Sequence, residues 1–171
     1  MEVAKSEAEK SGPLDANEVA GEAARAAEVL APHLRPTRAR LSEYFSEQLG
    51  VEVYLKPENF QRTGSFKVRG AGYALSKLDT QQRKWGVVTA SAGNHAQGVA
   101  AAARRMDIKA LIVMPESTPN TKLDAVKALG AEVIQSLQPD QLMIKIVNNQ
   151  LTELMGPVDS KIYYVTPGPT V

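Results

Sequence analysis

Apolar and polar positions along the chain follow two alternating spacings, which predict strands and helices in turn. Three short apolar or β-branched runs are typical of strands: residues 86–90, 109–114 and 131–135. The middle run is nearly all apolar, as a buried parallel strand should be. A helix-forming segment follows Asn94, and another begins at Thr118-Pro119 and ends at Gly130. This βαβαβ order with short connections predicts a parallel, doubly wound sheet.

The first half of the chain is expected to add helices around one more strand. Residues 18–31 are rich in alanine and helix-prone, with Asn17 as the expected cap. A second helix, ended by Gly50, is predicted from apolar side chains at helical spacing, and its Tyr44 and Phe45 are expected to pack in the core. A strand at residues 51–55 and a helix from residue 67 to about residue 78 follow.

Lys67 stands at an unusual place in this pattern. It follows Ser65, a good helix N-cap, and therefore falls in the first helical turn. The helix dipole disfavours a cation there and favours a neutral amine, which can attack an aldehyde to form a Schiff base. A solvent-facing lysine is the alternative, since most lysines are exposed.

A polar turn between the 86–90 strand and the next helix is the second candidate site. It contains Ser91, Gly93, Asn94 and His95. Backbone N–H groups at such a helix start attract carboxylates and phosphates, and the Asn94 amide can donate or accept a hydrogen bond. A nucleotide P-loop is excluded, because the Lys-Ser/Thr pair that it requires after its second glycine is absent.

Taken together, these motifs resemble those of a known family over about residues 37–135. The matching stretches are residues 54–71 (YLKPENFQRTGSFKVRGA), residues 91–98 (SAGNHAQG), and Val113-Met114-Pro115 with Thr118-Pro119 and Lys122. They are similar to the N-terminal part of fold-type II pyridoxal-phosphate enzymes, most of all to threonine dehydratase (threonine ammonia-lyase). The resemblance implies a truncated form of their three-layer α/β fold, similar to that of the tryptophan synthase β subunit, and a cytoplasmic lyase that is usually homo-oligomeric.

The resemblance also implies roles for individual residues. Lys67 would hold pyridoxal 5'-phosphate and remove the α-proton of the substrate, and Phe66 would pack near the cofactor ring. Asn94 would bond the 3′ oxygen of the cofactor. The turn from Ser91 to His95, including Gly93, would hold the carboxylate of an amino-acid substrate. Threonine would then give 2-oxobutanoate and ammonia, or serine would give pyruvate, within isoleucine biosynthesis or general amino-acid metabolism. If so, Lys67 and Asn94 must lie at the same sheet edge.

Two departures from the family pattern qualify this expectation. Ala92 stands where related serine racemases have a second catalytic serine, which favours dehydration over racemisation. No run of three glycines like the family's phosphate-binding loop is present in the 171 residues. Phosphate anchoring by N–H groups supplies much of the affinity for such a cofactor. We therefore expect weak or absent cofactor retention by this chain alone, which would be an incomplete enzyme; an inactive fragment or interaction module is the alternative.

The end of the chain departs from the dehydratase pattern. Residues 136–156 resemble the last helix of the N domain of a signal recognition particle GTPase, and the tail resembles the approach to its first GTPase strand. The sequence then divides into a disordered leader at 1–16, a lyase segment at 17–135 and an appended helix and tail at 136–171. The appended segment is a fusion fragment, or else a divergent helix that packs on the small domain or offers its apolar stripe to a partner.

Composition excludes several function classes. The formal net charge is +1, so electrostatics give no reason to expect nucleic acid or a membrane surface as a partner. The chain has no cysteine and two histidines, which argues against disulfides, a thiolate nucleophile and a zinc site. No apolar run approaches the length of a membrane span. The expected partner is a small-molecule amino acid.

Overall fold

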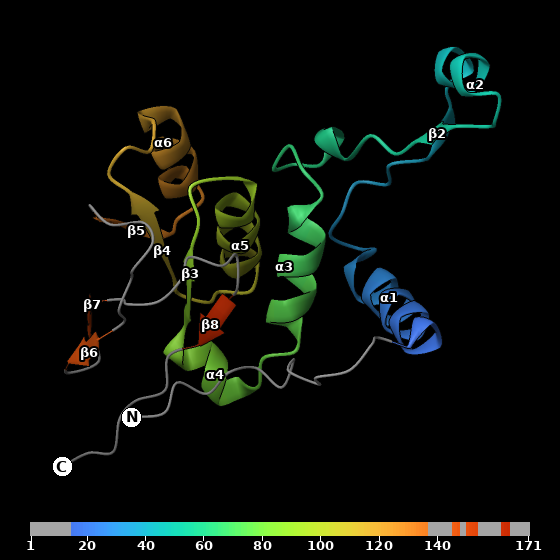
Figure 1. The fold of residues 1–171 in the computed structure, drawn as a ribbon. Helices are drawn as coiled ribbons and strands as arrows, with labels where there is room; N and C mark the ends of the chain where they lie inside the picture. The colour runs from blue at the N-terminus through green and yellow to red at the C-terminus, as the bar shows by residue number, and fades with distance from the viewer. Residues whose placement is uncertain (1–14, 137–144, 148–149, 154–161, 165–171) are drawn as a thin grey trace.

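The central element of the computed structural model, which describes residues 15–136, 145–147, 150–153 and 162–164, is a four-stranded sheet (Figure 1). Its order is β5-β4-β3-β8. Strands β3 (Val87–Ala90), β4 (Ala110–Pro115) and β5 (Glu132–Ser136) run parallel, as predicted, and each begins one residue after its predicted start. Strand β8 (Ile162–Tyr164) was not predicted and pairs antiparallel with β3.

The middle strands form the base of the hydrophobic core. All four residues of β3 are buried, and in β4 Ile112 and Met114 are fully buried. Helices α5 (Asn94–Arg105) and α6 (Asn120–Ala128) connect β3 to β4 and β4 to β5. Because the strand order advances in one direction and such crossovers are right-handed, both helices cover the same face of the sheet.

Two more helices are stacked outside α5. Helix α3 (Lys67–Ser76) packs along α5, and α1 (Ala16–Leu30) packs on α3 (Figure 1). Ala96, Ala100 and Ala103 of α5 are buried in the core cluster, whereas the close approach of α5 to α3 is made at Gly98. The N-cap of α1 is Asp15, which accepts the N–H of Asn17 at 3.0 Å; the prediction that Asn17 caps this helix was wrong.

A short helix that the sequence analysis missed leads into the sheet. Helix α4 (Thr80–Trp85) begins with a reciprocal capping box between Asp79 and Gln82 and ends at Gly86. Gly86 has a φ of +91°, and a Cβ there would lie 2.8 Å from the carbonyl oxygen of Lys109. Only glycine fits this turn without strain, so Gly86 sets where β3 starts beside β4.

The segment before α3 corrects two predictions. Strand β1 (Arg40–Leu41), helix α2 (Glu43–Leu49) and strand β2 (Tyr54–Leu55) form a separate unit in which β1 and β2 pair antiparallel. The strand expected at 51–55 is therefore shorter and lies outside the main sheet. Figure 1 shows α2 projecting away from the other helices. Tyr44 and Phe45 are 67% and 44% exposed, so the expectation that they pack in the core was wrong.

The region after β5 corrects a further prediction. Where a helix was expected, strands β6 (Lys145–Val147) and β7 (Gln150–Glu153) form an antiparallel pair. The β-branched Ile146 and Val147 favour a strand. The rest of the expected appended helix and tail, apart from β8, and residues 1–14 of the expected leader lie outside the described residues. Among the helices that are described, none has the length and apolarity needed to cross a membrane.

Candidate active site

Lys67 is the first residue of α3, in the first turn as predicted. The cap position is held by Phe66 rather than by Ser65, although the Ser65 hydroxyl accepts the N–H of Lys67 at 3.4 Å. The Lys67 side chain is half-buried, and its Nζ lies 5.3 Å from the centroid of the Phe66 ring. Phe66 is 59% exposed. The amine and an accessible aromatic surface therefore stand together at the start of α3.

The turn after β3 presents a second set of polar groups. The N–H of Ser91 donates to the carbonyl of Val113 at 3.0 Å, which fixes the turn at the end of β4, and the N–H of Gly93 donates to the Ser91 hydroxyl at 3.3 Å. Helix α5 begins at Asn94, which is exposed, and Gly93 at the cap position offers no side chain to the free N–H groups of the first turn.

The starts of α3 and α5, like that of α6, have no side-chain cap, in contrast to three other helices of the described structure. Side chains cap the first turns of α1, α2 and α4: Asp15, Ser42 and Asp79. The cap residues of α3 and α5 make no such bond. Backbone N–H groups at an uncapped helix start attract an anion through both hydrogen bonding and the helix dipole. The α5 start can therefore accept a carboxylate or phosphate.

Close packing brings Lys67 to this helix start. A Cβ added at Gly98, one turn beyond Asn94, would lie 3.0 Å from the carbonyl carbon and oxygen of Lys67. Further along, a Cβ at Gly72 would lie 3.4 Å from Nη2 of Arg105, so α3 and α5 run in the same direction. Both helices consequently start at the carboxyl edge of the sheet, where ligands of open α/β sheets bind.

His95 is the titratable group beside Lys67. Its side chain is half-buried, and its Nε2 atom is buried without a hydrogen-bond partner. Burial, and secondarily the positive charge of Lys67, lower the pKa of His95 below its ordinary value. The imidazole is therefore neutral at pH 7, and its unpaired nitrogen is free to bond a bound molecule.

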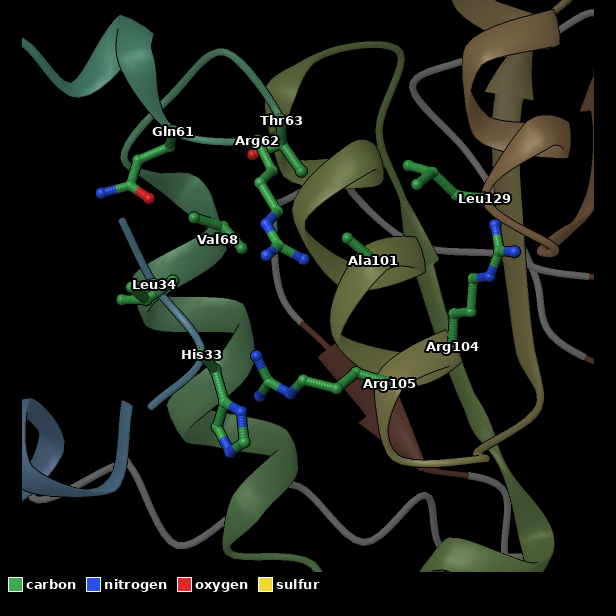
Figure 2. A pocket seen from close by; sticks show the side chains of 10 residues that line it. All are labelled: His33, Leu34, Gln61, Arg62, Thr63, Val68, Ala101, Arg104, Arg105 and Leu129. Carbon is green, nitrogen blue, oxygen red and sulfur yellow. The ribbon is translucent and has the colours of Figure 1, made fainter. Parts of the chain in front are cut away.

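A cavity of about 420 Å³ is lined by residues 61–63 of the loop that leads to Lys67 and by side chains of α3 and α5 (Figure 2). Figure 2 shows Arg62 and Arg105 extending between α3 and α5. The lining residues are His33, Leu34, Gln61, Arg62, Thr63, Val68, Ala101, Arg104, Arg105 and Leu129. None of the six residues predicted for the site is among them, so this cavity is separate from the edge that Lys67 and Asn94 share. Nor do the described residues contain a group of acidic, histidine or cysteine side chains that could hold a metal ion.

Residues 30–169 match the protein family described as pyridoxal-phosphate dependent enzyme, which covers most of the chain. The chain belongs to this family. The match continues past residue 135, where the sequence analysis placed a boundary, and that division of the chain stays a prediction.

Individual relatives agree with this assignment. L-threonine dehydratase biosynthetic IlvA of Lactococcus lactis is 53% identical over 94 residues, which are 55% of this chain and 23% of that protein. The processed form of threonine deaminase isoform 2 from Solanum lycopersicum has a TM-score of 0.64 at 42% identity, over 72% of this chain and 36% of that one. Serine racemase from Dictyostelium discoideum also has a TM-score of 0.64, at 36% identity, over 67% of this chain and 38% of that one. The chain thus spans less than two fifths of these relatives.

The described residues fit part of the family's cofactor. The amine of Lys67, the exposed Phe66 ring and the uncapped start of α5 stand together, and the orphaned Nε2 of His95 marks a position where a polar group of a ligand would be satisfied. These groups would surround the ring of the cofactor and the carboxylate of an amino-acid substrate. They include no glycine-rich cradle for a phosphate, so the fit concerns the reactive half of the cofactor.

Sequence reasoning missed the contacts that tie together the segments on either side of Lys67. Glu58 and Arg69 form an ion pair on either side of it, and Gln61 bonds the backbone of Arg35. Glu58, Gln61 and Arg69 lie within the motif at residues 54–71, but the sequence analysis gave them no role. Gly98 offered a local signal, because a glycine inside an alanine-rich helix costs stability and often marks a close approach.

Proposed function

We propose that this chain is the lysine-bearing part of a pyridoxal-phosphate dependent lyase that releases ammonia from threonine or serine. The main support is the placement of Lys67 against the uncapped start of α5, across Gly98. The family membership and the threonine dehydratase relatives favour the same reaction. The net conversion turns threonine into 2-oxobutanoate and ammonia, or serine into pyruvate and ammonia.

Each site residue has a proposed task. When bound, the cofactor supplies an electron sink for the carbon that loses its proton. Lys67 holds the cofactor through its amine and takes the α-proton of the substrate. The Asn94 amide bonds the 3′ oxygen of the cofactor ring, against which Phe66 packs. The Ser91 hydroxyl and the N–H groups from Gly93 onward hold the substrate carboxylate.

Racemisation of serine is the second candidate, supported by the structural similarity to a serine racemase. Proton return to the opposite face requires a second base there. Ala92 offers no hydroxyl at the position where the resemblance to serine racemases implies that base, so we favour elimination. Because no run of three glycines is present, we also propose that these 171 residues retain the cofactor weakly.

An absorbance titration of the chain with pyridoxal phosphate tests the proposal. We expect a saturable new band that is lost in Lys67→Ala and retained in Lys122→Ala, a control that removes an exposed lysine. Threonine, L-serine and D-serine are then added in turn, and oxo-acid formation is compared with change of configuration. An identical spectrum in both variants would contradict the role of Lys67, and racemisation without oxo acid would favour the second candidate.

A further inference from the structure

A bidentate ion pair joins the segment before Lys67 to the helix that carries it. Nε and Nη2 of Arg69 donate to the two carboxylate oxygens of Glu58 at 2.7 and 2.8 Å. Glu58 belongs to the 3₁₀ turn η1 (Glu58–Phe60), whereas Arg69 lies in the first turn of α3. Two parallel charge-assisted bonds fix orientation as well as distance.

The carboxylate is held by further groups and is largely shielded from water. The Glu58 side chain is 15% exposed, and it also accepts a hydrogen bond from the Thr37 hydroxyl. Lys56 in turn donates to the Thr37 carbonyl at 2.5 Å. Chiefly through the bond from Arg69, the pKa of Glu58 falls to about 2. The pair therefore stays charged throughout the neutral range.

A second pair of hydrogen bonds fixes the loop between Glu58 and Arg69. The Gln61 side chain accepts the N–H of Arg35 at 3.3 Å and donates to the Arg35 carbonyl at 2.9 Å, as a backbone neighbour would. Gln61 is 4% exposed, so these bonds are protected from water. Residues 58–61 of the loop that leads to Lys67 are thus tied both to residues 35–37 and to α3.

The first turn of α3 packs on α5 at Gly98, but few hydrogen bonds hold its N–H groups. Its cap residue, Phe66, makes no side-chain capping bond, and the Ser65 hydroxyl lies 3.4 Å from the Lys67 nitrogen. An uncapped first turn frays readily, which would move the Lys67 amine away from α5. Arg69, two residues beyond Lys67, is positioned to prevent this.

We propose that the Glu58–Arg69 pair is a positioning device that holds the Lys67 amine toward the start of α5. The importance of that amine rests on the proposed function, but its placement is measurable without cofactor. Neither Glu58 nor Arg69 touches the reacting groups in this account; both act through the backbone of the first α3 turn.

Trace acetylation of every lysine, followed by peptide mass spectrometry across a range of pH, measures this placement. In Glu58→Gln we expect the labelling rate of Lys67 to rise about fivefold relative to Lys122, which is the effect of losing a typical helix cap. Arg69→Lys keeps the charge but not the two-pronged geometry, and it should give a smaller rise. The exchanged pair, Glu58→Arg with Arg69→Glu, should restore part of the original pH profile.

A second ion pair on the same helix provides the matched control. Glu22 pairs with Lys77 at the far end of α3 and with Arg25 of its own helix, so Glu22→Gln removes both pairs without touching the first turn of α3. We expect the acetylation of Lys67 across the pH range to stay unchanged in Glu22→Gln. The proposal is overturned if Lys67 labels alike in the wild type and Arg69→Lys, or if Glu22→Gln accelerates it equally. Should Glu58→Gln fail to fold, Arg69→Lys and the exchanged pair still decide. A failure to bind pyridoxal phosphate would count against the proposed function and leave this result standing.

Discussion

Substitution of Gly98 by alanine probes the contact that places Lys67. The new Cβ would lie 3.0 Å from the carbonyl carbon and oxygen of Lys67 and 3.2 Å from the nitrogen of Val68. All three atoms belong to the backbone of the first α3 turn, so they cannot rotate aside as a side chain would. The helices must separate by a few tenths of an ångström.

Two opposing terms determine the change in the free energy of unfolding. Overpacking of a close contact costs about 1–3 kcal/mol, whereas replacing glycine by alanine inside a helix gains about 1 kcal/mol. Gly70 isolates the second term, because it lies within α3 and a Cβ there would meet no atom within 4 Å. We expect Gly70→Ala to be more stable than the wild type, and Gly98→Ala to be about 1–3 kcal/mol less stable than Gly70→Ala.

Urea unfolding and thermal melts measure this difference, which corresponds to roughly 3 °C in Tm for each kcal/mol. Lysine acetylation of the same samples should show altered labelling of Lys67 in Gly98→Ala and not in Gly70→Ala. If Gly98→Ala is as stable as Gly70→Ala and labels alike, α5 does not approach Lys67 closely, and the reasoning that joins the two halves of the site fails.

Three further predictions use other parts of the structure. Glu58→Gln should lower the free energy of unfolding by about 1–3 kcal/mol at pH 7. Because the pKa of Glu58 is about 2 in the folded chain against an ordinary 4.5, this loss should disappear as the pH falls from 4.5 to 2. A difference in urea unfolding that stays constant over this pH range would contradict the prediction. In Lys67→Ala the pKa of His95, followed by NMR, should rise yet stay below 6.5, since burial remains; an unchanged pKa would argue against their proximity. Gly86→Ala should destabilise the chain by more than about 2 kcal/mol and Gly130→Ala by about 1 kcal/mol, because both have positive φ but only Gly86 faces a backbone oxygen at 2.8 Å; equal thermal melts would refute this.

The sheet and the shared edge of the site followed from local patterns. Apolar runs of strand length alternate with helical segments, which predicts a parallel sheet, and the right-handedness of crossovers sets the face that each connecting helix covers. Since a parallel sheet brings its helix starts to one edge, the placement of Asn94 at that edge required no long-range information. The position of Lys67 in a first turn was equally readable, from Ser65 and the helix-forming residues after it.

Other features depend on contacts that a local pattern does not contain. The apolar stripe of α2 indicates that one face is apolar, but not what covers it, so Tyr44 and Phe45 were wrongly assigned to the core. At Ile146 and Val147 the helical spacing of apolar residues competed with β-branched preference, and the latter prevailed. The pairing of Glu58 with Arg69 joins residues eleven positions apart through a fold that must already be known.

The short helix α4 was missed for a different reason. Its signal, Asp79 followed three residues later by Gln82, is a readable capping box. With six residues the helix presents no amphipathic period, so the periodic pattern alone could not reveal it.

The most direct test of the central claim is to locate the lysine that binds pyridoxal phosphate. The chain is incubated with the cofactor, reduced with borohydride and digested, and the modified peptides are identified by mass spectrometry. We predict that the label lies predominantly on Lys67 and disappears in Lys67→Ala, while other lysines react at the level of Lys122. Label spread evenly over the lysines, or retained in Lys67→Ala, would contradict the account.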